Sequence, residues 1–239
     1  MTLDTMIVLM DDMLSYDLDN FKRRDGHTPT AEEKTAQINY GLRTIGRYIC
    51  MFDPAIVMVP TAESYIVNLR DSDVVSRKVL EVKQVIINGS VLGKPNKMKG
   101  LWNIGDVERL ASNWRRDTSG VPNKAWQLGT DLYLHLKPNA AVVSEEDTWI
   151  AGTYMPDDLV YGENAEPDLP EELHEAAVRV AAIFAADPSA AEGEALNRLG
   201  RYSSQAYAMA KEIRIRNYKQ MQAYTSEPGS SVPNFVYYG

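Results

Sequence analysis

The residues best suited to chemistry in this sequence are two adjacent acidic pairs, Asp11-Asp12 and Asp157-Asp158. Paired carboxylates could hold a metal ion or act as acid and base catalysts. Adjacent side chains point in different directions on a helix or a strand, and acids also gather at helix starts and turns without any catalytic role. We therefore interpret both pairs as structural.

The three histidines, His27, His135 and His174, are far apart, and none has a second histidine at metal-ligand spacing. His135 alternates with Leu134 and Leu136 on an expected strand. His174 lies among acids that open an expected helix, where we expect water to reach it. Each histidine is interpreted as structural or exposed, and we expect no bound metal.

The run from Gly89 to Pro95 approaches the pattern of a phosphate-binding loop. It has one intervening residue too few, and proline occupies the place of the magnesium-binding hydroxyl. Asn88-Gly89-Ser90 would be a glycosylation sequon in a secreted protein but is interpreted here as a turn. The single cysteine, Cys50, excludes an intramolecular disulfide and a Cys-based zinc site, and its neighbours Ile49 and Met51 indicate burial. We expect no catalytic residue, no cofactor and no enzymatic activity.

The four tryptophans, Trp102, Trp114, Trp126 and Trp149, all lie in the middle of the chain. They could build the core of a β-rich domain or form a stacking platform for sugars. We favour the core and keep the platform as the alternative.

The composition, 44% hydrophobic and 24% charged over 239 residues, is typical of a soluble globular protein with one core or two small ones. No stretch approaches the roughly 18 apolar residues of a membrane span, and the N-terminus is acidic where a signal peptide is basic. We expect a product made in the cytoplasm. The formal net charge of -8 argues against a protein that grips nucleic acid through its phosphates, but suits a channel through which DNA slides.

Helical patterns occupy both ends of the chain. Apolar residues recur at helical spacing from Leu3 to Leu14, and Thr30 with Glu33 forms a capping box for a second helix that ends before Pro54. A third helix begins at Pro170 and stops before Pro188, and a fourth runs from about Pro188 to Tyr224.

Between these ends the chain is rich in β-branched and aromatic runs separated by turn residues. Asn88-Gly89 and Gly129-Thr130 are predicted to be two-residue hairpin turns, and one short helix is expected from Ile104 to Trp114. The sequence thus predicts an α+β fold, in which a helical bundle (residues 1–54 and 163–224) carries an inserted β-rich domain (55–162) and an extended C-terminal arm (225–239).

Two features near the C-terminus suit partner binding. The arm ends in Phe235, Val236, Tyr237 and Tyr238, and aromatic residues concentrate at protein interfaces. It could dock into a neighbouring subunit or partner, or fold back on its own core. A basic cluster near the end of the last helix is either a solvated face or a contact for an acidic partner; it consists of Lys211, Arg214, Arg216 and Lys219.

Taken together, several segments resemble the head-to-tail adaptor (connector) proteins of tailed bacteriophages, a family that includes the tail tubular proteins of short-tailed phages. AQINYGLRTIGRYI is similar to the family's second helix, and KVLEVKQVIINGSVL to its paired strands with an Asn-Gly turn. A tryptophan-bearing helix and the strands VPNKAWQLGTDLYLHLKP follow. DLPEELHEAAVRVAAIFAADP is similar to the helix that returns the chain to the helical domain. The resemblance spans residues 30–188.

The resemblance implies a structural virion protein of the neck or tail, which assembles as a closed ring, commonly a dodecamer, beneath the portal protein. Such a ring would meet the tail tube or nozzle protein on its other face, and double-stranded DNA would pass through it without sequence-specific binding. No membrane is involved. The residues expected at the portal or subunit interface are Arg214, Arg216, Lys219, Phe235, Val236, Tyr237 and Tyr238.

The alternative from another class is a virion-associated carbohydrate-binding or hydrolytic protein, in which the tryptophans stack on sugar and Asp157 and Asp158 do chemistry. It predicts a concave aromatic site. A third possibility, a DNA-binding module, is weakened by the acidic balance and would require an affinity that falls steeply with salt.

Overall fold

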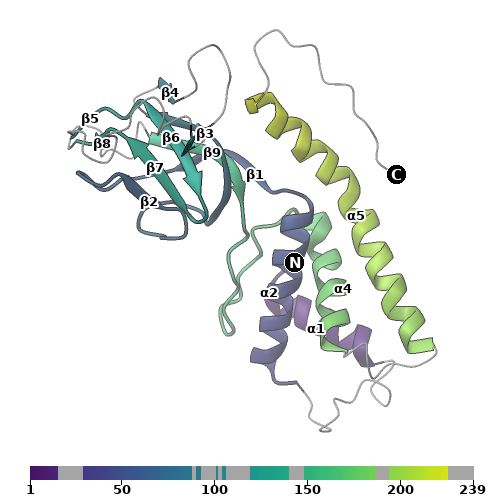
Figure 1. The fold of residues 1–239 in the computed structure, drawn as a ribbon. Coiled ribbons are helices and arrows are strands. Elements are labelled where there is room, and N and C mark those ends of the chain that lie inside the picture. The colour runs from purple at the N-terminus through teal and green to yellow at the C-terminus, as the bar shows by residue number, and fades with distance from the viewer. Residues whose placement is uncertain are drawn as a thin grey trace. The chain divides into compact units, whose positions relative to one another are not determined.

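The computed structural model describes residues 1–15, 29–87, 90–92, 101, 104–105, 119–139, 148–186 and 194–225. It contains both helices and sheets and therefore belongs to the α+β class. The chain divides into two compact units: Met1–Met51 with Met155–Tyr218, and Phe52–Tyr154 with Lys219–Gly239. The strands lie in the second unit, and the long helices lie in the first apart from the end of the last helix, whose residues from Lys219 on belong to the second (Figure 1).

Three helices of the first unit pack against one another: α1 (Leu3–Ser15), α2 (Ala31–Tyr48) and α4 (His174–Ala185). Their contact faces follow the helical spacing expected from the sequence, with Leu3, Met6 and Met10 of α1 fully buried. α2 and α4 approach closely at Gly41, where an added Cβ would lie 2.2 Å from the carbonyl oxygen of Ala177. Only a glycine permits this approach.

The start of α2 confirms the predicted capping box. The Thr30 hydroxyl accepts a hydrogen bond from the backbone N–H of Glu33, and the Glu33 carboxylate accepts one from the N–H of Thr30. α2 ends at Tyr48, before Pro54 as expected.

The last helix, α5 (Glu194–Thr225), runs beside α4 in Figure 1. Its Leu199 packs with Ala186 against Leu14, Ile183 and Tyr202. Farther along α5, the side chain of Asn217 donates a hydrogen bond of 3.1 Å to the carbonyl of Ile49. One narrow side of α5 is buried, which leaves much of the helix surface exposed to solvent. None of the helices in the described part of the chain is both long and apolar enough to cross a membrane.

The second unit contains three sheets, of which the largest has the strand order β1-β9-β3-β4. These strands are β1 (Phe52–Val57), β9 (Thr148–Tyr154), β3 (Val79–Ile87) and β4 (Ser90–Leu92). Ile87 is paired with Ser90 in the β3–β4 ladder, and the predicted turn residues Asn88 and Gly89 lie outside the described residues.

The second sheet has the order β2-β7-β6 and contains β2 (Ile66–Asn68), β7 (Asp131–His135) and β6 (Lys124–Leu128). Leu128 pairs with Asp131, and Gly129 has a φ of 63°, so the predicted hairpin turn at Gly129-Thr130 is confirmed. The smallest sheet pairs β5 (Ser119–Gly120) with β8 (Lys137–Pro138) in parallel. Of the helix expected from Ile104 to Trp114, only Ile104 and Gly105 are among the described residues, and both are helical.

The side chain of Gln127 connects the two larger sheets. Gln127 of β6 accepts a hydrogen bond of 2.8 Å from the N–H of Val82 in β3 and donates one of 2.9 Å to the carbonyl of Leu80. The pairing of β3 with β9 is irregular between Val82 and Gln84, next to this connection. Gln127 therefore fixes the position of β6 against a strand of the other sheet.

Candidate functional site

One member of each acidic pair that could have done chemistry forms an ion pair. Asp11 of α1 lies 2.7 Å from the Nζ of Lys34 in α2, and Asp158 lies 3.6 Å from the Nε of Arg43. Both contacts join parts of the first unit. Within the described ranges, no group of three or more His, Cys, Asp or Glu side chains could hold a metal ion.

The two described histidines lie inside the protein. His135 Nδ1 is 3.1 Å from the side-chain oxygen of Asn123. The expectation that water reaches His174 is wrong, because this side chain is only 3% exposed. A short 3-10 helix, η2 (Glu171–Leu173), precedes α4, and His174 Nε2 donates a 2.8 Å hydrogen bond to the carbonyl of Leu169. The ring is thus held against the chain that leads into the helix. His27 lies outside the described residues.

The expected burial of Cys50 is also wrong, since the residue is half-buried. It follows the C-cap of α2 with a φ of 51°, and this left-handed turn directs the chain out of the helix. Of the run that approaches a phosphate-loop pattern, Ser90–Leu92 forms strand β4, and the flanking Gly89 and Gly93–Pro95 lie outside the described residues.

Trp126 confirms the interpretation of a core tryptophan. It is 1% exposed, and its ring stacks on Tyr133 with centroids 5.6 Å apart and planes 11° apart. Tyr65 continues the stack at 6.2 Å from Tyr133. A ring buried in this way offers no face to a sugar. Trp149 is half-buried, and Trp102 and Trp114 are not among the described residues.

The predicted interface residues Arg214 and Arg216 are exposed and point to different sides of α5. The guanidinium of Arg214 lies 4.7 Å from the ring centre of Tyr48, which also contacts the ring of Tyr207 at 4.7 Å. This stacking orders the side chain of Arg214 while it remains exposed. Lys219, one turn farther, is exposed and belongs to the second unit.

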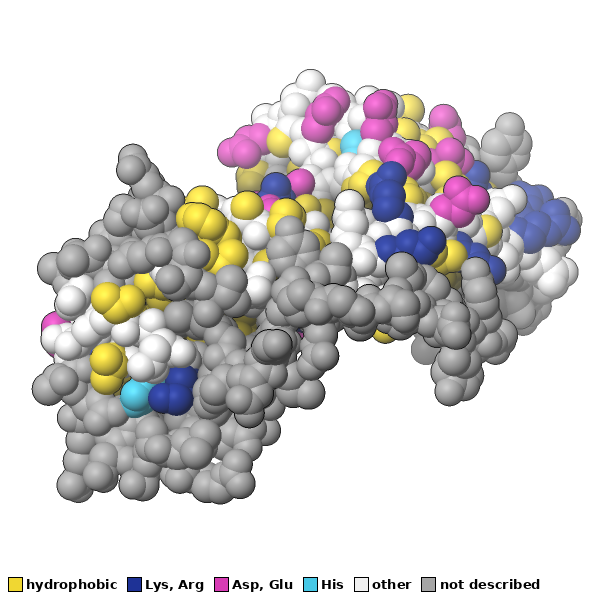
Figure 2. Space-filling model, turned by 90° about the horizontal axis from the view of Figure 1, so that it is seen from above, with side chains coloured by type: hydrophobic (Ala, Val, Ile, Leu, Met, Phe, Trp, Pro, Cys, Tyr) yellow, Lys and Arg dark blue, Asp and Glu magenta, His cyan; other side chains and the backbone are white. Residues whose placement is uncertain are grey.

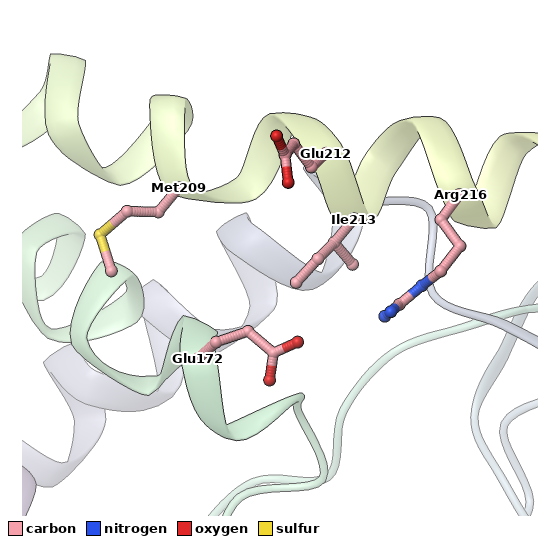
Figure 3. Close-up of a pocket in the computed structure, with 5 residues that line it drawn as sticks. All are labelled: Glu172, Met209, Glu212, Ile213 and Arg216. Carbon is pink, nitrogen blue, oxygen red and sulfur yellow. The ribbon is translucent and has the colours of Figure 1, made fainter.

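Arg216 lines an open groove of about 490 Å³ between α5 and η2, together with Met209, Ile213, Glu212 and Glu172 (Figure 3). Ile213 and Arg216 are directed from α5 toward η2, from which Glu172 projects. The groove has apolar and charged walls, and among its described lining residues no buried polar atom without a partner indicates what would occupy it.

The four apolar and aromatic residues predicted for the arm, Phe235, Val236, Tyr237 and Tyr238, lie outside the described residues. The described interface residues Arg214, Arg216 and Lys219 all lie on α5, but Arg214 and Arg216 are not brought together because they point to different sides of the helix.

A surface that the sequence analysis missed is the return loop, which we define as Met155–Pro170, the segment between β9 and η2. Asn39 of α2 holds it, because its buried side-chain amide donates to the carbonyl and accepts from the N–H of Leu159, both at 2.8 Å. The next two residues, Val160 and Tyr161, are 54% and 50% exposed. The signal in the sequence was an acidic run: from Met155 to Val178 there are eight acids and no Lys or Arg.

A second exposed apolar contact connects α2 and α4. The rings of Tyr40 and Phe184 meet edge to face with centroids 4.1 Å apart, and the two residues are 44% and 51% exposed. A pair of large aromatic rings in contact on the surface is a feature of protein interfaces.

Comparison with models of known protein families and with curated proteins finds no match to this chain.

Proposed function

We propose that this chain is a structural virion protein, a head-to-tail adaptor of a tailed bacteriophage that forms a ring between the portal and the tail and has no enzymatic activity. The portal would bind on one face of the ring and the tail tube or nozzle protein on the other. Double-stranded DNA would pass through the centre without sequence-specific binding.

The observation that carries this proposal is the insertion of one unit into another. The helical unit is built from Met1–Met51 and Met155–Tyr218, and the strand-bearing Phe52–Tyr154 lies between these segments in the sequence. α2 and α4, which come from opposite sides of the insertion, pack at the close approach of Gly41 and Ala177. This is the order of elements that the resemblance to adaptor proteins implies, with a helical bundle carrying a β-rich insertion.

Exposed aromatic residues favour a protein that assembles with other subunits over one that functions as a monomer. Tyr40 and Phe184 contact each other on the surface, and Tyr161 and Tyr218 are also exposed, while interfaces are enriched in aromatic residues. Subunits of a ring bury such residues against their neighbours, through contacts between two different surfaces of identical chains.

We assign the portal or subunit contact to Arg214, Arg216 and Lys219 on α5 and to the terminal residues Phe235, Val236, Tyr237 and Tyr238. Basic residues on α5 remain available for a partner because Arg214 and Arg216 are exposed. We place the protein in the neck of the virion, as a dodecamer.

The test is direct imaging of the purified full-length chain, alone and mixed with portal-containing capsids, by negative-stain electron microscopy. We expect closed rings of uniform diameter, or rings seated at the portal vertex. A chain that remains monomeric at all concentrations and leaves the vertex empty contradicts the adaptor. Binding of a polysaccharide by such a monomer would instead favour the carbohydrate-binding alternative.

A further inference from the structure

Two surfaces of the helical unit have complementary chemistry. The first is the exposed part of the return loop, where the exposed apolar residues Val160 and Tyr161 are flanked in the sequence by the exposed acids Asp158 and Glu163. An apolar centre with a charged rim is the usual anatomy of a protein interface. The loop is fixed in place at Leu159 by the two hydrogen bonds of Asn39, so it is held in shape before any partner binds.

The second surface is the basic face of α5, which we define as Lys211, Arg214 and Tyr218. All three side chains are exposed, and they follow one another at i, i+3 and i+7 along the helix. Tyr48 stacks under the guanidinium of Arg214 and thereby reduces the conformational entropy that this side chain would lose on binding. Arginine and tyrosine are the residue types enriched at the energetic centres of interfaces.

The charge distribution within the chain gives these two surfaces opposite charge. α5 carries six basic and two acidic residues in a protein whose net charge is -8. On the helical unit in Figure 2, acidic side chains (magenta) gather toward one edge, and basic side chains (dark blue) lie partly beside them and partly away from that edge. Asn39, which holds the return loop, and Tyr48, which lies under Arg214, are nine residues apart in α2 and therefore project from opposite sides of that helix. One molecule therefore presents the two surfaces in different directions.

We propose that the return loop of one copy docks on the basic face of α5 of a second copy, so that identical subunits associate head to tail. Val160 and Tyr161 contact Tyr218, and Asp158 and Glu163 pair with Lys211 and Arg214. A contact between two different surfaces leaves one of each free at the ends of a pair, so further copies can add, and a ring forms when the rotation from one copy to the next closes the circle. The inference rests on the proposed function in that it names the subunit contact of the ring.

Charge reversal tests the contact, with association measured by sedimentation velocity of the full chain in about 50 mM and about 500 mM salt. The basic-reversed chain carries Lys211→Glu and Arg214→Glu, and the acid-reversed chain carries Asp158→Lys and Glu163→Lys. Each chain alone sets like charges against each other, so we expect self-association to weaken about tenfold or more at low salt. The substitution of Asp158 also removes its ion pair with Arg43, but this pair lies at the surface and contributes at most about 1 kcal/mol to the stability of the fold.

The decisive sample is the equal mixture of the two reversed chains. Every contact in an alternating assembly then joins opposite charges again, and association returns to the level of the unchanged protein. Arg201→Glu on another side of α5 and Glu32→Lys on α2 are the matched controls, and both leave association unchanged. If all variants form rings equally well, this contact is wrong, but the proposed function as a ring-forming adaptor is retained. If the unchanged chain does not associate at either salt concentration, the proposed contact between copies is wrong. Binding of the protein at the portal vertex is tested separately by imaging.

Discussion

Asn39 and Leu159 are 120 residues apart in the sequence and are joined by two hydrogen bonds of 2.8 Å, in which the side-chain amide of Asn39 pairs with the backbone N–H and carbonyl of Leu159. Asn39 is buried in α2, and Leu159 lies in the return loop. This pairing imitates the backbone pairing of two strands, and it fastens the chain that comes back from the β-rich unit onto the helical unit.

Replacement of this asparagine is the first test. Asn39→Ala leaves the buried N–H and carbonyl of Leu159 without partners, so we expect a loss of about 2–4 kcal/mol in the free energy of unfolding. Urea denaturation followed by circular dichroism measures it. Asn197→Ala, an exposed asparagine on α5, is the control and should change stability by less than about 0.5 kcal/mol. Equal effects of the two variants would show that the pairing is not important for stability.

Replacement of two helical glycines by alanine should change the stability of the protein in opposite directions. In Gly41→Ala the new Cβ meets the Ala177 carbonyl oxygen at 2.2 Å, so α2 and α4 must move apart at a cost of about 1–3 kcal/mol or more. At Gly200 of α5 nothing lies within 4 Å of an added Cβ, and Gly200→Ala should stabilise by about 0.5–1 kcal/mol. Thermal unfolding of both variants gives the comparison. A stabilising effect at Gly41 would exclude the close crossing of the two helices.

The connection between the two sheets is tested at Gln127. Gln127→Leu preserves the approximate size but removes the bonds to Val82, Leu80 and the carbonyl of Gly129, and we expect a loss of about 1–3 kcal/mol. Hydrogen exchange should also be faster at the N–H of Val82. The neighbouring Leu128 is 56% exposed, so Leu128→Ser serves as the control and should leave that exchange rate unchanged.

The C-terminal arm is predicted to bind the portal and to contribute little to the fold. A chain truncated after Tyr224 should keep its melting temperature but no longer sediment with portal-containing capsids. Substitution of Phe235, Val236, Tyr237 and Tyr238 by serine should have the same effect, because the aromatic groups supply the binding energy. Substitution of Ser230 and Ser231 by alanine is the control, because it changes the arm but keeps both its length and its aromatic residues. Normal portal binding by the truncated chain would mean that the arm assignment is wrong.

Local signals in the sequence determined the elements of this protein. The capping box of Thr30 and Glu33, the turn at Gly129-Thr130 and the helical spacing of Leu3, Met6 and Met10 depend on residues a few positions apart. Their interactions form within one element, so the sequence pattern is sufficient to predict them. The same patterns predicted an α+β chain with helices at both ends.

Only the tertiary structure decided which distant residues meet. Asn39 is hydrogen-bonded to Leu159, Gly41 packs against the backbone of Ala177, and Glu172 lies across a groove from α5. No spacing in the sequence indicates these contacts. Exposure was decided in the same way, since His174 is buried while Tyr161 is exposed. The physical reason is that burial and long-range contacts depend on how whole elements pack, and the energy of packing belongs to the assembled faces and not to any single segment.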